Sequence, residues 1–171
     1  MAGTSIYILL TKYPDTLSKV VAGITRGYYS HVSIGFDESC SEFYSFTQRG
    51  FHIEDPKRIS AKRKAVPCSL YKLDVSQTTY DLMKSRVNLY RSTSSVWKYN
   101  LLGVLFGVMQ IPYFRRKHHR FCSQFVAEIL EAGNAVSLTK EAAVMLPKDF
   151  LKMKGLDLSF QGTLSNLAVM H

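Results

Sequence analysis

The stretch that decides the fold is RFCSQFVAEILEA, residues 120–132. Its apolar residues recur at helical spacing until a Gly-Asn stop signal, which predicts an amphipathic helix over 121–132. Cys122 falls in the first turn of this helix, ahead of the apolar stripe. Ser123 and Gln124 separate the thiol from that stripe, so Cys122 is placed at the helix entrance.

A thiol at this position has a recognisable chemistry. The positive end of the helix dipole and the free backbone amides favour the thiolate, and the same amides can hold an oxyanion that forms on a bound carbonyl. A buried cysteine is more often a small apolar filler, and Cys40 and Cys68 suit that interpretation. Cys122 is therefore the candidate nucleophile.

A nucleophilic cysteine needs a base, and His31 is the candidate. It lies in YSHVSIG, residues 29–35, which is expected to begin a strand that would hold the imidazole rigidly. The alternative is a histidine that is merely hydrogen-bonded within the fold. The other four histidines lie beside loops, in a basic run or at the C-terminus.

The remaining pattern predicts an α+β fold, with an antiparallel sheet packed against helices. Residues 30–37 and 42–47 should form a hairpin, and 55–64 reads as an exposed basic loop. Further strands are expected at 5–11, 65–73 and 156–162, and further helices at 14–27, 76–90 and 146–153.

The bulk properties fit one domain over residues 1–171 with its own core, since 46% of the residues are hydrophobic. Three widely spaced cysteines suit neither a disulfide framework nor a zinc site, so we expect no metal and no cofactor. A reducing compartment fits that cysteine usage, and the N-terminus does not resemble a signal peptide. These features favour a cytoplasmic protein.

Two segments qualify this picture. Residues 99–114 are apolar but too short and too Gly- and Pro-interrupted to span a bilayer, so a buried helix is expected, with an interfacial or substrate-contacting segment as the alternative. The net charge of +9 favours an anionic partner, although a solvated loop would also explain the densest basic run. That run, 115–120, comprises Arg115, Arg116, Lys117, His118, His119 and Arg120.

The order of these motifs resembles the permuted papain-like cysteine hydrolases, a branch of the NlpC-type superfamily with YiiX-like amidases and lecithin retinol acyltransferase-like enzymes. The resemblance rests on residues 30–37, 42–46 and 121–126, with support from 99–103 and 146–150. It covers most of the chain.

The resemblance implies a circularly permuted papain-like fold with Cys122 as nucleophile and His31 as base. Relatives usually carry His, Glu, Asp or an amide as a third group that orients the imidazole. The expected hairpin register puts Ser45 or its neighbours opposite His31. Ser45 is the first choice, and Glu42, a backbone carbonyl or a water are the alternatives.

Two functions therefore compete. The first is a cysteine-dependent hydrolase or acyltransferase acting on an amide, ester or thioester of a small-molecule, peptide or lipid-like acyl substrate. The second is a catalytically inactive binding module that docks an anionic partner through its basic surface. Thiol reactivity separates them, because only the enzyme needs one fast-reacting cysteine.

Overall fold

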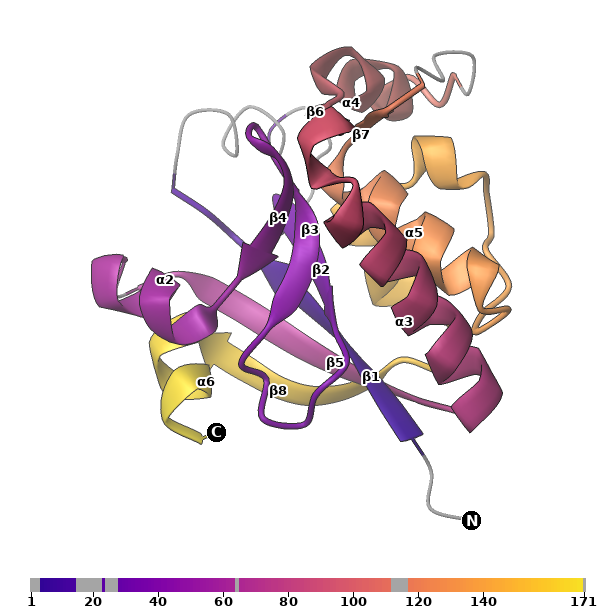
Figure 1. The fold of residues 1–171 in the computed structure, drawn as a ribbon. Helices are drawn as coiled ribbons and strands as arrows, with labels where there is room; N and C mark the ends of the chain where they lie inside the picture. The colour runs from indigo at the N-terminus through magenta and orange to yellow at the C-terminus, as the bar shows by residue number, and fades with distance from the viewer. Residues whose placement is uncertain (1–3, 15–22, 24–27, 64, 112–116, 171) are drawn as a thin grey trace.

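The computed structural model describes residues 4–14, 23, 28–63, 65–111 and 117–170. A six-stranded antiparallel sheet in the order β4-β3-β2-β1-β5-β8 forms its centre, and β6 and β7 pair separately in parallel (Figure 1). The strands are β1 (Thr4–Thr11), β2 (His31–Gly35), β3 (Phe43–Thr47), β4 (Gly50–Glu54), β5 (Pro67–Val75), β6 (Lys98–Tyr99), β7 (His119–Arg120) and β8 (Asp157–Thr163). The helices are α2 (Pro56–Lys62), α3 (Gln77–Ser92), α4 (Leu101–Val108), α5 (Cys122–Ala132) and α6 (Leu164–Met170), with 3-10 turns η1 (Ser94–Val96), η2 (Ala142–Val144) and η3 (Pro147–Lys152).

Both faces of the sheet are covered, which explains the unbroken apolar run of β1. Ile6, Ile8 and Leu10 alternate into the larger core beneath α3 and α5, while Tyr7 and Leu9 enter a smaller core closed by α6 (Figure 1). The predicted α+β class, with an antiparallel sheet packed against helices, is confirmed.

The helix predicted over 121–132 is present as α5, and that predicted over 76–90 as α3. The apolar stripe of α5 packs against Met83, Val87 and Tyr90 of α3 in the larger core. Ser76 caps α3 by accepting a hydrogen bond from the Thr79 amide at 3.1 Å. The helix expected over 14–27 falls almost entirely outside the described residues.

The structure adds elements that the sequence pattern did not indicate. The exposed loop expected over 55–64 is wrong, because most of it forms α2. Asp55 starts that helix by accepting hydrogen bonds from the amides of Lys57 and Arg58, and Pro56 occupies the first turn. Strand β4 and helix α6 were also not predicted.

Within the apolar segment 99–114, residues 101–108 form the short helix α4, which follows β6 and precedes β7 in the chain. The expectation of a buried helix is wrong for its outer side, where Leu101 and Leu102 are exposed. Within the described part of the chain, none of the helices combines the length and apolar character needed to cross a membrane. Of the basic run 115–120, Arg115 and Arg116 lie outside the described residues.

Replacing Gly50 with alanine should destabilise the fold. Gly50 turns the chain between β3 and β4 with φ +90°, and an added Cβ would lie 2.3 Å from the Trp97 carbonyl oxygen. We expect a loss of about 1–3 kcal/mol in the free energy of unfolding, measured by urea denaturation. Gly107→Ala is the matched control, because its Cβ would meet only ordinary contacts of 3.6 Å or more. Equal stability of the two variants would contradict this account of the turn.

Candidate active site

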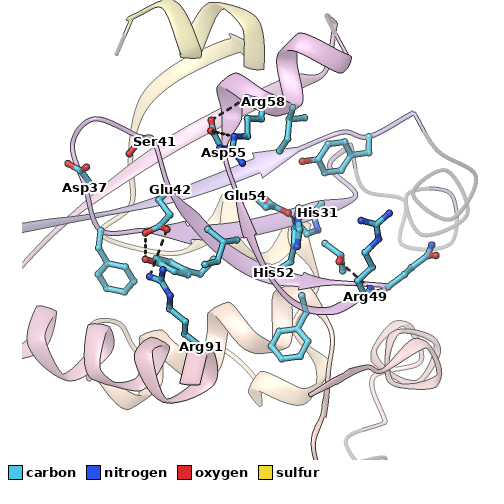
Figure 2. A pocket seen from close by; sticks show the side chains of 18 of the residues that line it. His31, Asp37, Ser41, Glu42, Arg49, His52, Glu54, Asp55, Arg58 and Arg91 are labelled. Atoms are coloured by element: carbon cyan, nitrogen blue, oxygen red, sulfur yellow. Dashed lines mark hydrogen bonds and ion pairs between the residues drawn. The ribbon is translucent and has the colours of Figure 1, made fainter. Parts of the chain in front are cut away.

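A buried ion pair joins two strands that are not neighbours in the sheet. His31 opens β2 and Glu54 closes β4, with β3 between them. The His31 Nε2 lies 2.7 Å from the Glu54 Oε1, and the two residues are only 7% and 3% exposed. Figure 2 shows the two side chains meeting in the middle of the lining of a large cavity.

The surroundings of this pair favour its charged form. Burial opposes the imidazolium, but the Glu54 carboxylate and Cys122 outweigh it and hold the pKa of His31 well above 6.5. Burial likewise opposes the carboxylate, yet the charge and hydrogen bond of His31, helped by Ser33, hold the pKa of Glu54 below 4.5. The pair is therefore imidazolium and carboxylate over a wide pH range.

Cys122 occupies the first turn of α5, as the sequence predicts. Phe121 is the N-cap residue, and no side chain among the described residues caps this helix end, which leaves amides of the first turn available to a ligand. Cys122 is near enough to His31 to raise the pKa of the imidazole. Because Glu54 occupies Nε2, the nitrogen left for the thiol is Nδ1.

The group that orients the His31 imidazole is not the one that the sequence predicts. Ser45 is buried, but its hydroxyl donates to the Val32 carbonyl at 2.7 Å. Ile34 pairs with Tyr44 and Gly35 with Phe43, so continuing this register puts Ser45 opposite Ser33 and not opposite His31. The structure therefore replaces Ser45 with Glu54 as the group that orients the imidazole.

Glu42, the alternative to Ser45, is engaged elsewhere. Its carboxylate accepts a hydrogen bond from the Tyr44 hydroxyl and lies 3.9 Å from Arg91. Glu54 was missed because β4 itself was missed. Its signal is the alternation in 50–54, where apolar Phe51 and Ile53 separate Gly50, His52 and Glu54.

A second ion pair fixes the chain that leads into the nucleophile. The Arg120 Nε lies 2.7 Å from the Glu128 Oε2, which also accepts from the Tyr90 hydroxyl at 2.9 Å. Gln124 donates to the other Glu128 oxygen at 3.0 Å. Arg120 is thus tied to α5 two residues before Cys122, and this member of the basic run is not a solvated charge.

The cavity beside His31 has a volume of about 1440 Å³ and follows β4 along its length (Figure 2). Its lining includes His31 and Glu54 together with Tyr13 and Tyr99, which are aromatic walls for a ligand that reaches the imidazole. The Tyr13 ring lies 5.5 Å from the His31 ring. Cys122 is not among the residues that line the cavity, so the cavity reaches the imidazole and not the thiol.

Cys40 and Cys68 are as buried as Cys122 but have different surroundings. Burial, with the nearby Asp37 and Glu38, raises the pKa of the Cys40 thiol to about 11, and burial raises that of Cys68 to about 12. Cys122 is the cysteine that acts on a histidine. Among the described residues, no group of three or more His, Cys, Asp or Glu side chains is arranged to hold a metal ion.

Comparison with known proteins identifies no relative that could be used to interpret this site. A scan against protein-family models finds no match for the chain, and a search of curated proteins finds none either. The arrangement of Cys122, His31 and Glu54 therefore carries the functional argument by itself.

Replacing Glu54 with glutamine should destabilise the protein most between pH 4.5 and 6.5. The lowered pKa of Glu54 means that its stabilising contribution is complete above 4.5 and is lost as the pH falls through the lower folded value. The raised pKa of His31 means that its contribution is complete below 6.5 and is lost as the pH rises through the higher folded value.

The measurement is urea denaturation across pH in a Cys122→Ser background, which removes the third ionisable group that contributes to the pKa of His31. In that window the Glu54→Gln change should cost on the order of 3 kcal/mol, because it strands a buried imidazolium. Glu42→Gln is the control and should cost much less, since Glu42 is partly exposed. A cost that does not vary with pH would mean that Glu54 and His31 do not form a charged pair.

Proposed function

We propose that this protein is a cysteine-dependent hydrolase or acyltransferase that attacks an amide, ester or thioester carbonyl. The observation that carries the proposal is the 2.7 Å contact between the His31 Nε2 and the buried carboxylate of Glu54. Cys122 lies near the same imidazole and contributes to its raised pKa. A nucleophile, a base and a group that orients the base are the three parts such chemistry needs.

In the proposed reaction the Cys122 thiolate attacks the carbonyl carbon, and a carbon–sulfur bond forms as the carbonyl π electrons move to oxygen. The tetrahedral intermediate then collapses, and the bond to the leaving nitrogen, oxygen or sulfur breaks. The leaving group takes its proton from the His31 imidazolium. The product of this half-reaction is a thioester on Cys122.

In the second half-reaction, His31 removes a proton from water or from another acceptor, which attacks the thioester and releases the thiolate. Water gives hydrolysis, and another acceptor gives acyl transfer. Uncapped amides in the first turn of α5, beginning with that of Cys122, would donate to the oxyanion in both halves. Glu54 supports both by holding the imidazole on its Nε2 side and stabilising the imidazolium.

The family assignment is part of the same proposal. An antiparallel sheet that presents His31 before a cysteine at a helix start suits the permuted papain-like order, in which the histidine strand precedes the nucleophile helix. A cytoplasmic location would match three cysteines that are all unpaired. Glu54 would then fill the third position, for which glutamate is one of the residues usual in that family.

Cys122 should react with iodoacetamide near neutral pH far faster than Cys40 or Cys68. The pKa values of about 11 and 12 leave those two thiols almost entirely protonated. A histidine beside a cysteine, in contrast, activates the cysteine as a nucleophile. His31→Ala should slow alkylation of Cys122 at least about tenfold, because the counter-charge is lost. Mass spectrometry of the alkylated peptides ranks the three sites in one experiment.

The three thiols are similarly buried, so limited access alone cannot produce the expected ranking. Ser45→Ala is a matched control, because it removes a buried hydroxyl that donates to the Val32 carbonyl and, among the described residues, not to His31 or Cys122. It should leave the Cys122 rate nearly unchanged. Equal rates at the three cysteines of the folded protein would favour the inactive binding module instead.

An activated ester such as p-nitrophenyl acetate should give a burst of nitrophenol of about one equivalent per chain, because the acyl group is retained on the enzyme. Cys122→Ala should abolish the burst, and Cys68→Ala should preserve it. The acyl adduct should be found on the peptide that contains Cys122. Acylation at another residue with Cys122 unmodified would rule out this nucleophile.

A further inference from the structure

Exposed apolar side chains are concentrated around α4. Twelve large hydrophobic residues are exposed in the described part of the chain, and five of them fall between positions 96 and 111. These five, which we call the α4 face, are Val96, Leu101, Leu102, Met109 and Ile111. The other seven are spread over α3, η3, β8, α6 and the chain before β2.

Packing of the fold does not account for these residues. Helix α4 reads LLGVLFGV and carries no polar side chain. The inner side of α4 packs against Phe121 through Val104. Gly107 lies on the same side, since a Cβ added there would be 3.6 Å from the Phe121 ring. Leu101 and Leu102 remain 55% and 45% exposed, on a surface where a water-facing helix ordinarily carries polar residues.

The sequence on both sides of α4 carries charge of one sign, although Glu141 lies directly before η2, which packs on α4. Residues 82–127 contain eight lysines and arginines and no aspartate or glutamate. Lys98, just before α4, and Lys117, after it, are both exposed. The Lys98 amide donates to the His118 carbonyl at 2.8 Å, so the two lysines lie close together beside the paired strands β6 and β7. Apolar side chains bordered by lysines match the boundary of acyl chains and anionic headgroups.

The position of α4 suits a flat partner. Figure 1 shows α4 with β6 and β7 at one extremity of the molecule, at the opposite end from α2 and α6. A bilayer could therefore meet the α4 face without meeting the rest of the sheet. A protein partner would also accept the leucines, but nothing in 82–127 offers it a carboxylate for its own lysines and arginines.

We propose that the α4 face docks onto the surface of an anionic lipid bilayer, with its leucines among the upper acyl chains and Lys98 and Lys117 at the headgroups. The contact is interfacial and not membrane-spanning. It is independent of the proposed function, because none of its residues belongs to the group of Cys122, His31 and Glu54.

The test is co-sedimentation of the full chain with vesicles of phosphatidylcholine, alone or mixed with phosphatidylglycerol. The protein should bind the mixed vesicles and bind them less at high salt. Leu101→Glu/Leu102→Glu should weaken binding at least about tenfold, and Lys98→Glu/Lys117→Glu should do the same on mixed vesicles only.

Val169→Glu/Met170→Glu is the matched control, because those residues are 87% and 64% exposed on α6, far from α4 in Figure 1. It should bind like the unmodified chain, as should Cys122→Ser, which separates docking from catalysis. Circular dichroism confirms that each variant is folded.

Three results would overturn the proposal. The first is no binding of the unmodified chain to mixed vesicles. The second is equal binding by the leucine variant, which would reduce the interaction to general electrostatics. The third is a dimer, detected by light scattering, that the leucine variant dissociates while vesicle binding is absent, because the α4 face would then join two copies of the chain.

Discussion

The contact between His31 and Glu54 constrains the rest of the structure. Two ionisable groups are almost completely removed from water, and each would be costly to bury without the other. They come from strands separated by β3, so the contact is possible only when β4, β3 and β2 pair in this order and register. The turn at Gly50, which reverses the chain into β4, is therefore as necessary to the site as the two charged residues.

The same pair explains why burial does not determine the chemistry of the three cysteines. Burial raises the pKa of Cys40 and Cys68, because a thiolate in apolar surroundings lacks a counter-charge. Cys122 is also buried, but it lies near an imidazole whose pKa is raised, and it begins a helix that no side chain of the described residues caps. What distinguishes Cys122, the proposed nucleophile, is therefore its electrostatic environment, which is assembled from α5, β2 and β4.

Local signals were enough for the parts of the site that sit on strongly periodic elements. Helix α5 follows from its apolar spacing, which places Cys122 at the entrance, and β2 follows from a run of strand-forming residues after His31. Glu54 was missed, because β4 is only five residues long and the alternation over 50–54 is a weak signal unless the turn that pairs β4 with β3 is recognised as well. Helix α2 has a readable start at Asp55 and Pro56, but it lacks an apolar stripe.

The place of α4 in the fold follows from topology and not from its own hydrophobicity. Strands β6 and β7 pair in parallel, so the chain between them has to cross over, and α4 lies in that crossover. Because β7 leads directly through Phe121 into Cys122, and Phe121 packs on Val104, the apolar helix is held next to the entrance of the nucleophile helix. The Arg120–Glu128 pair fixes the same junction from the other side. The inner side of α4 is therefore fixed against Phe121, the residue that directly precedes Cys122.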